Sequence, residues 1–181
     1  METLCSRHGI PCLSVSGINL PAGKDLLNRL KPDLLILAGT GILRNGILKI
    51  PRMGTLNAHM GLLPFFRGMN VAEWAALVGA PSGCSVHYVD EGVDTGRILA
   101  TQELSSEGIR NIEIFRKRVN RLQVDLLCKV LVAITEGQDL PSYCQLAEQG
   151  RQFFSMHPVL KKILGNWLQT EMLIRPKIGF A

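Results

Sequence analysis

The chain has 181 residues, of which 46% are hydrophobic and 19% are charged, and it carries a formal net charge of +5 with a pI near 9.1. This composition is typical of one folded globular domain that can bury a core, and it excludes a disordered chain. The apolar run at residues 34–43 has ten residues, which is too few for a membrane span of about twenty.

In the first third of the chain, short apolar runs alternate with helical patterns. Leucines at 26, 27 and 30 form a helical stripe that Pro32 closes, and the continuous apolar run at 34–38 is typical of a strand buried on both faces. We expect the end of a helix at 2–8, a strand at 10–15, a helix at 21–31, a strand at 34–38, a short helix at 44–50 and a strand at 56–59.

The remaining chain continues this alternation. We expect a helix at 68–78, strands at 84–89 and 97–104, a long helix at 107–134 and a helix at 158–172. Strands and helices in turn predict an α/β fold with a mostly parallel sheet flanked by helices. We assign residues 1–140 to one α/β catalytic domain and residues 141–181 to a C-terminal helical extension of the same domain.

Asn57 and His59 are the strongest candidates for chemistry. In an extended segment, residues two apart point to the same face, and these two precede the breakers Gly61 and Pro64. An amide N–H suits a developing oxyanion, and an imidazole can give or take a proton near neutral pH. The acidic, glycine-bracketed loop at 90–96 is expected to bring a carboxylate to the histidine.

A parallel sheet binds its ligands outside the carboxyl ends of its strands. The turn after Ala38, the strand end at Asn57 and His59, and the loop after Val89 all follow predicted strands. We therefore expect these three segments to meet at one edge of the sheet.

The cysteines argue against a metal centre or a disulfide framework. There are five, an odd number, without a C-x-x-C pair: Cys5, Cys12, Cys84, Cys128 and Cys144. This usage fits a reducing cytoplasm, and the N-terminus has no basic-then-apolar signal segment. We expect a soluble cytoplasmic protein without a membrane partner, in which Cys84 is a buried structural thiol.

Three further features each have two interpretations. His87 lies within an apolar strand and is interpreted as a satisfied core residue. Arg67 either contacts a substrate phosphate or carboxylate, or holds a loop through backbone carbonyls. The basic residues clustered near 110–121 and 161–177 either bind a phosphorylated ligand or RNA, or form solvated faces; we favour the solvated faces.

Residues 57–68 and 83–96 resemble the signature blocks of the formyltransferase catalytic domain. That family includes methionyl-tRNA, glycinamide ribonucleotide and amino-sugar N-formyltransferases. The first block reads N-x-H-x-x-L-L-P-x-x-R-G, and the second is of the type V-H-x-V-D-E-G-x-D-T-G. The resemblance covers roughly the first two-thirds of the chain, and the two blocks together are specific.

The resemblance implies a Rossmann-like fold and transfer of a formyl group from 10-formyltetrahydrofolate to an amine. It implies that Asn57, His59 and Asp94 are the catalytic residues, and a nearby Asp94 carboxylate is expected to raise the pKa of His59. It further implies that the folate contacts Ile42, Leu43, Gly61, Leu62, Leu63, Pro64, Val89, Asp90 and Glu91.

The chain also departs from this pattern. The strand, glycine-rich turn, helix and strand that open the family's domain are not found before the segment at 2–8, and Gly61 stands where many members have serine. The sequence is therefore expected to form an N-terminally truncated fold, with exposed sheet edges that allow oligomers.

The sequence leaves the formyl acceptor open. The forty or so residues after Leu140 are too few for the tRNA-binding domain of methionyl-tRNA formyltransferases, so a small-molecule amine, such as an amino sugar, is favoured and tRNA is not excluded. A formyltetrahydrofolate hydrolase and a weakly catalytic, folate-binding remnant are also compatible with the sequence.

Overall fold

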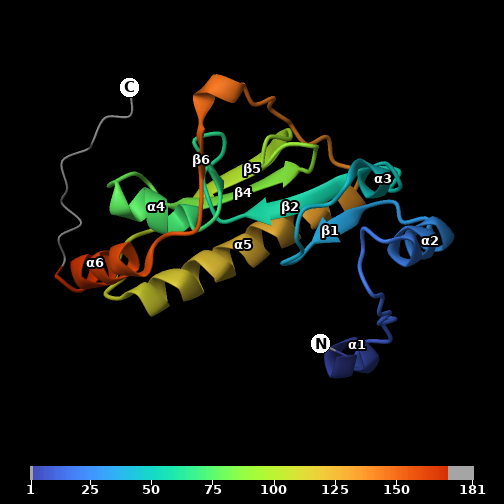
Figure 1. The fold of residues 1–181 in the computed structure, drawn as a ribbon, viewed down its shortest axis with the longest axis horizontal. Helices are drawn as coiled ribbons and strands as arrows, with labels where there is room; N and C mark the ends of the chain where they lie inside the picture. Colours follow the sequence, from blue (N-terminus) through green and yellow to red (C-terminus); the bar gives the residue numbers. More distant parts are fainter. Residues whose placement is uncertain (1, 171–181) are drawn as a thin grey trace.

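The computed structural model describes residues 2–170, and its centre is a four-stranded sheet (Figure 1). The strands lie in the order β1-β2-β4-β5. Their bounds are Leu35–Leu37 for β1, Thr55–His59 for β2, Gly83–Tyr88 for β4 and Ile98–Glu103 for β5. Each lies within a predicted segment or within one residue of it, because the apolar runs that form them are bounded by glycine, proline or charged residues.

The sheet is mixed rather than mostly parallel, although the α/β class with a Rossmann-like sheet flanked by helices is confirmed. Strands β1 and β2 are parallel, whereas β4 is antiparallel to both β2 and β5. Residues 89–97 connect β4 to β5 without a helix. A connection of this kind suits antiparallel neighbours, because a parallel pair needs a longer crossover.

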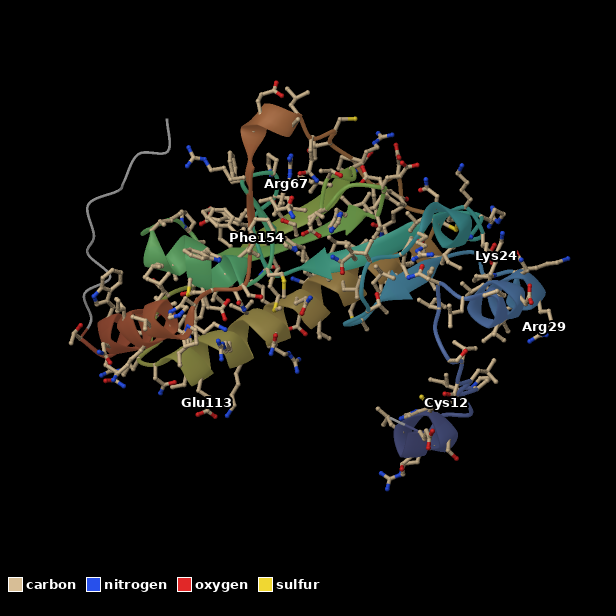
Figure 2. The ribbon with its side chains drawn as sticks, viewed as in Figure 1. Cys12, Lys24, Arg29, Arg67, Glu113 and Phe154 are labelled. Carbon is tan, nitrogen blue, oxygen red and sulfur yellow. The ribbon has the colours of Figure 1, made fainter. Side chains whose placement is uncertain are left out.

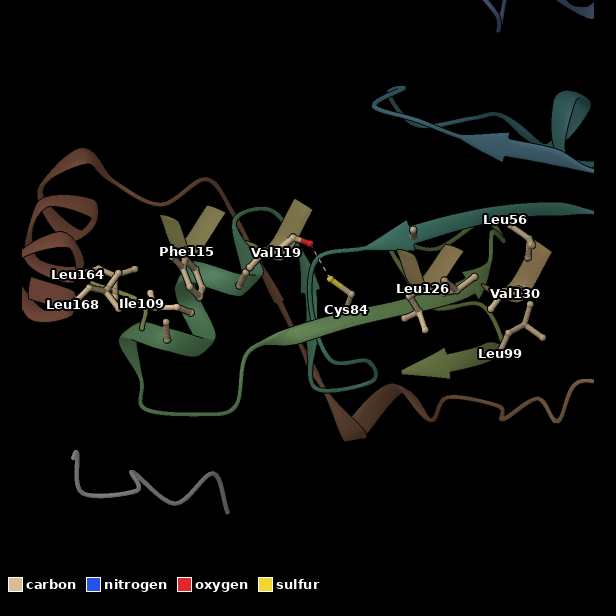
Figure 3. Packing of buried hydrophobic residues seen from close by; sticks show 14 residues of the cluster. Leu56, Cys84, Leu99, Ile109, Phe115, Val119, Leu126, Val130, Leu164 and Leu168 are labelled. Carbon is tan, nitrogen blue, oxygen red and sulfur yellow. Dashed lines mark hydrogen bonds between the residues drawn. The ribbon is translucent and has the colours of Figure 1, made fainter. Parts of the chain in front are cut away.

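Helix α5 (Ile112–Thr135) covers one face of this sheet and packs on β2, β4 and β5 (Figure 1). Alternation along the strands decides which side chains meet it, since successive residues point to opposite faces. The buried cluster between helix and sheet combines strand residues with a stripe of α5 at helical spacing (Figure 3): Leu56, Ala58, Cys84, Val86, Phe115, Val119, Leu126 and Val130.

The start of α5 differs from the predicted one. Asn111 is extended and its side chain accepts a hydrogen bond from the Ile114 N–H at 2.8 Å. This is an N-cap, which satisfies a backbone donor that the first turn leaves without a partner. The helix therefore begins at Ile112 instead of residue 107.

The other elements lie at the two ends and along the open face of the sheet (Figure 1). Helices α2 (Pro21–Leu30) and α3 (Asn45–Leu48) lie beside β1, and α1 (Glu2–Arg7) precedes them. Helices α4 (Val71–Leu77) and α6 (Pro158–Gln169) pack on each other at the opposite end. The 3-10 turn η1 spans Ala147–Gln149.

Two short strands escaped prediction, and one predicted strand is absent. Strand β3 (Phe66–Gly68) pairs in parallel with β6 (Arg151–Phe153), so the predicted helix at 68–78 begins only at Val71. Three-residue strands leave no periodic signal. Residues 10–15 form no strand and are almost all exposed, because no described strand lies beside them to complete hydrogen bonds.

The C-terminal segment packs on the rest of the molecule. Leu164 and Leu168 of α6 are 0% and 1% exposed and belong to the same buried cluster as Leu56. Residues 171 and 172, which the sequence assigned to this helix, lie outside the described residues. No helix within residues 2–170 combines the length and the apolar character that crossing a membrane requires.

Candidate active site on the open face of β2 and β4

The face of β2 and β4 opposite α5 carries polar side chains. Asn57 lies directly across from His87, and His59 lies directly across from Ser85. Residues opposite each other in an antiparallel pair share a face, so these four side chains form one polar patch. Their sequence neighbours point the other way, into the cluster against α5.

Asp94 joins this patch from the loop between β4 and β5. Its Oδ2 lies 3.4 Å from His59 Nδ1, and its Oδ1 lies 3.4 Å from His87 Nε2. Because β4 is antiparallel, the loop after Val89 starts at the amino end of β2, where the Val89 N–H donates to Thr55 O at 2.8 Å. The expectation that the three segments meet at the carboxyl ends is wrong for this loop, which folds back over the polar face.

The hydrogen bonds of the two histidines assign their protons. His59 Nε2 donates to Phe66 O at 2.8 Å, and His87 Nδ1 donates to Tyr88 O at 2.7 Å, since a carbonyl oxygen only accepts. In the neutral rings the other nitrogens are therefore acceptors. His87 Nε2 accepts from Asn57 Nδ2 at 3.2 Å, whereas His59 Nδ1 faces the Asp94 carboxylate.

Burial decides the charge of His59. It lowers the pKa of His59 below the usual 6.5 and outweighs the Asp94 charge and the Phe66 carbonyl, which raise it; a charged His87 lowers it further. Asp94 acts to raise the pKa of His59, as expected, but the net direction is downward because the imidazole is 6% exposed and loses its hydration. His59 is therefore neutral at pH 7.

Asp94 stays ionised at the same pH. Burial raises the pKa of its carboxyl, but the hydrogen bond that a protonated His87 donates, the charges that the two histidines carry when protonated, and the Gly68 N–H together hold that pKa below 3.8. The Gly68 N–H donates to Asp94 Oδ2 at 2.8 Å. The patch thus places an anion beside a neutral imidazole.

The turn at 61–64 is fixed next to His59 by Ser85. Its hydroxyl donates to Gly61 O at 2.8 Å and accepts from the Leu63 N–H at 2.9 Å. Gly61 and Leu63 are buried, and Leu62 and Pro64 are half-buried. A Cβ on Gly61 would lie 2.7 Å from Val71 Cγ2 and 3.0 Å from His59 Nε2, which explains why a glycine fits here.

The other residues expected to contact folate have different surroundings. Ile42 is 78% exposed, whereas Leu43 is 5% exposed and packs with Leu27 and Ile47. Asn45 donates from its amide to Glu91 Oε1, so the segment that carries Ile42 adjoins the acidic loop.

Within the acidic loop itself the expected residues differ in exposure. Val89 is half-buried, and Asp90 and Glu91 are exposed. Asp90 Oδ1 accepts from Thr95 Oγ1 at 2.6 Å and from the Gly92 N–H at 3.1 Å, and these bonds close its own loop.

The surroundings of Cys84 and Arg67 decide between the roles considered for each residue. Burial raises the pKa of the Cys84 thiol to about 12, so this residue is a structural thiol as predicted. Arg67 is 6% exposed and donates to Gln145 Oε1 at 3.2 Å and Leu146 O at 2.9 Å. Of its two interpretations, the one in which it holds a loop is confirmed.

Sequence reasoning missed the parts of the site that come from distant segments. His87 is buried, as predicted, but it also lies between Asn57 and Asp94. Its spacing of two from Ser85 in a strand was the available signal, because it places both on one face. Nothing local to Gln145 indicates that it lies against the Asp94 loop.

The chain is similar in sequence to formyl transferases. The family model for formyl transferase matches residues 12–131. Methionyl-tRNA formyltransferase from Syntrophus aciditrophicus is 35% identical over 98% of this chain and 57% of its own length. The enzyme of that name from Clostridioides difficile is 36% identical over 78% of this chain and 45% of its own length. The chain spans about half the length of these relatives.

Solved structures share the fold. Glycinamide ribonucleotide transformylase 1 from Symbiobacterium toebii has a TM-score of 0.64 at 28% identity and covers 74% of this chain and 67% of its own. The formyltransferase PseJ from Anoxybacillus kamchatkensis has a TM-score of 0.67 at 19% identity and covers 85% of this chain and 81% of its own. The PseJ crystals contained a formamido sugar nucleotide and tetrahydrofolate.

Proposed function

Because the chain belongs to the formyl transferase family, we propose that it transfers a formyl group from 10-formyltetrahydrofolate to a primary amine, with Asn57, His59 and Asp94 as the catalytic residues. The observation that carries this proposal is the position of the Asp94 carboxylate, 3.4 Å from the buried His59 imidazole, on the face that also presents Asn57.

In this reaction a bond forms between the amine nitrogen and the formyl carbon, and the bond from that carbon to the folate nitrogen breaks. The amine must lose one proton, and the departing nitrogen must gain one. Negative charge develops on the formyl oxygen, and Asn57 Nδ2 can donate to it because only one of its two amide hydrogens has a described partner, His87.

His59 and Asp94 are suited to move the proton. His59 is neutral at pH 7 and its Nδ1 lone pair faces Asp94 Oδ2 at 3.4 Å. A proton that reaches Nδ1 lies between the imidazole and the carboxylate, and the Asp94 charge stabilises the imidazolium. The same proton can then pass to the departing nitrogen, so the pair ends the reaction as it began.

The residues expected to hold the folate fit a ligand with an apolar ring and polar edges. Ile42 is an exposed apolar side chain, and its segment adjoins the acidic loop through the bond between Asn45 and Glu91. The half-buried Val89, Leu62 and Pro64 supply further apolar surface near the polar patch. When bound, the folate supplies the formyl carbon, and the side chains of His59 and Asp94 move the proton.

The acceptor is proposed as an amine, and its identity is a matter for experiment. The relatives that match 98% of the chain are named methionyl-tRNA formyltransferases, whereas PseJ acts as a precedent for a sugar nucleotide in the same fold. The small-molecule acceptor predicted from the short C-terminal segment stays a prediction.

The test is to mix the purified chain with 10-formyltetrahydrofolate and a panel that contains methionyl-tRNA, a nucleotide-linked 4-amino sugar and glycinamide ribonucleotide. Tetrahydrofolate release is followed by absorbance, and formylated product by mass spectrometry. We expect release that depends on one class of amine, with one product formed for each tetrahydrofolate.

The remaining outcomes contradict the proposal. Release at the same rate without any amine indicates a hydrolase, in which water is the acceptor. Folate binding by a folded protein, without release for any amine, indicates a remnant that no longer performs the transfer.

A further inference from the structure

We propose that Gln145 is a positioning residue for Asp94. Together with the buried Arg67, Gln145 lets the segment at 143–149 hold the Asp94 carboxylate beside His59. The expected effect on kcat rests on the proposed function, whereas the expected effect on the titration of His59 can be measured without turnover.

Asp94 needs outside support because of its backbone. Its φ is 54°, in the left-handed region that residues other than glycine seldom adopt. The side chain is held by the Gly68 N–H, and the bonds of Asp90 to Gly92 and Thr95 close the loop, but none of these bonds holds the Asp94 carbonyl. A second restraint on the main chain is therefore required to keep this conformation.

Gln145 supplies that restraint. Its Nε2 donates to Asp94 O at 3.0 Å and to Gly96 O at 2.6 Å. These two carbonyls belong to the Asp94–Thr95 and Gly96–Arg97 peptide units, so one amide group holds two peptide units at the end of the loop. Gln145 is half-buried, and water competes less effectively for its hydrogen bonds than at the surface.

Arg67 orients the other end of the same amide. Its Nε donates to Gln145 Oε1 at 3.2 Å, and its remaining donors reach Leu146 O at 2.9 Å and Ala147 O at 3.4 Å. Arg67 is 6% exposed, and no ion pair with a carboxylate is found for it among residues 2–170. A buried cation of this kind depends on its hydrogen bonds, and its acceptors come from one segment, so that segment must fold against it. Figure 2 shows Arg67 beside the segment that leads into η1.

The segment is also anchored on both sides of Gln145. Tyr143 and Ile98 exchange two backbone hydrogen bonds of 2.9 Å at the start of β5, and β6 pairs with β3. Strand β3 contains both Arg67 and Gly68, so it restrains Asp94 twice: directly through the Gly68 N–H, and indirectly through Arg67 and Gln145. The segment at 143–149 thus restrains the loop that carries Asp94 to the polar patch.

The experiment compares Gln145→Glu and Gln145→Ala with the unchanged chain. Glutamate keeps an acceptor for Arg67 but replaces the donor to Asp94 O and Gly96 O with a carboxylate, which repels both carbonyls. Alanine removes both interactions. Gln149→Glu is the matched control, because Gln149 lies in the same segment and its described side-chain hydrogen bond is with the Leu146 N–H rather than with the Asp94 loop.

The first readout is the imidazole titration of His59 by nuclear magnetic resonance. Its neighbours with charge are Asp94 from the loop and His87 from β4. Because Asp94 raises the pKa of His59, a displaced Asp94 must shift the titration midpoint downward, by about 0.3 pH units or more. We expect this shift in both Gln145 variants and not in Gln149→Glu.

The second readout is steady-state kinetics. A misplaced proton acceptor is expected to lower kcat about tenfold or more and to leave KM for the amine within about twofold. If the unchanged chain shows no turnover but His59 shifts as expected, the proposed function fails and the positioning role stands.

The proposal is overturned if folded Gln145→Glu, the variant that preserves the contact with Arg67, leaves both the titration of His59 and kcat unchanged. In that case the segment at 143–149 has a structural role only. The proposed formyl transfer by the unchanged chain does not depend on this result. If Gln145→Ala does not fold, Gln145→Glu alone decides the question.

Discussion

At the scale of single residues, the site depends on a competition between hydration and charge at His59. The imidazole lies within 3.4 Å of a carboxylate, yet burial is the larger influence and holds its pKa below 6.5. A neutral imidazole is a proton acceptor, whereas an imidazolium is not. In the reaction proposed above, the burial that costs His59 its charge would therefore suit it to receive the proton of the attacking amine.

This competition predicts a pH dependence of stability. In the unfolded chain His59 binds a proton near pH 6.5, whereas in the folded chain its pKa is lower and it binds the proton only at lower pH. The unfolded state therefore binds more protons below pH 6.5, and the free energy of unfolding must fall as the pH drops below this value. The lowered pKa of Asp94 acts in a separate window below pH 3.8. We expect urea denaturation at pH 7.5 and 5.5 to show this loss, and His59→Asn to reduce it.

His8→Asn is the control for that measurement, since His8 is exposed and lies outside the polar patch. An equal loss between pH 7.5 and 5.5 in the unchanged chain and in His59→Asn would contradict the assignment of the effect to His59.

At the scale of elements, two strands and one helix set the site through alternation. Asn57 and His59 of β2 belong to the polar patch, and Leu56 and Ala58 pack on α5, as do Cys84 and Val86 of β4. These periodicities are legible in the sequence, and so the strands and the long helix were predicted. Strand direction was not, because it depends on where a connection returns the chain rather than on local composition.

The close approach of β3 and β6 predicts that substituting Gly68 changes stability far more than substituting Gly165 of α6. Gly68 has φ of 97°, and a Cβ there would collide with the Phe153 carbonyl, whereas Gly165 in α6 has nothing within 4 Å of its Cβ position. Gly68→Ala should strongly destabilise the fold, because left-handed backbone and a fixed carbonyl both oppose it. Gly165→Ala should be neutral or stabilise by up to ~1 kcal/mol.

Thermal unfolding followed by circular dichroism measures both variants. A Gly68→Ala protein as stable as the unchanged chain would show that β3 and β6 do not approach each other as described.

At the scale of the whole molecule, the site joins segments that are far apart in sequence. Asn57, His59 and Asp94 were predicted from two motif blocks, because the residues of each block stand close together in the chain. The supports of Asp94 were not, since Gln145 lies 51 residues away from it and Arg67 lies 78 residues from Gln145. Local patterns carry no information on such contacts, which arise only when the C-terminal segment folds across the sheet.

The shared core predicts that residues 141–170 do not unfold separately. Leu164 of α6 is fully buried with strand residues of the central sheet, whereas Val159 of the same helix is 57% exposed. Leu164→Ala should lower the free energy of unfolding by about 2–5 kcal/mol, and Val159→Ala should change it by less than about 0.5 kcal/mol.

In urea, the tryptophan fluorescence, which comes from Trp74 and Trp167, and the circular dichroism of the whole chain should change in one transition. Two separate transitions would indicate that the C-terminal segment is a unit of its own.

The central claim, that the polar patch of β2, β4 and the Asp94 loop performs formyl transfer, is tested most directly by following a ¹³C-labelled formyl carbon from folate to amine under single-turnover conditions. We predict that the unchanged chain and Asn28→Ala, an exposed control on α2, move the label at equal rates. Asn57→Ala and Asp94→Asn should each be slower by about a hundredfold, as is usual when an oxyanion donor or a proton acceptor is removed. Transfer at the full rate in a folded Asp94→Asn protein would contradict the account.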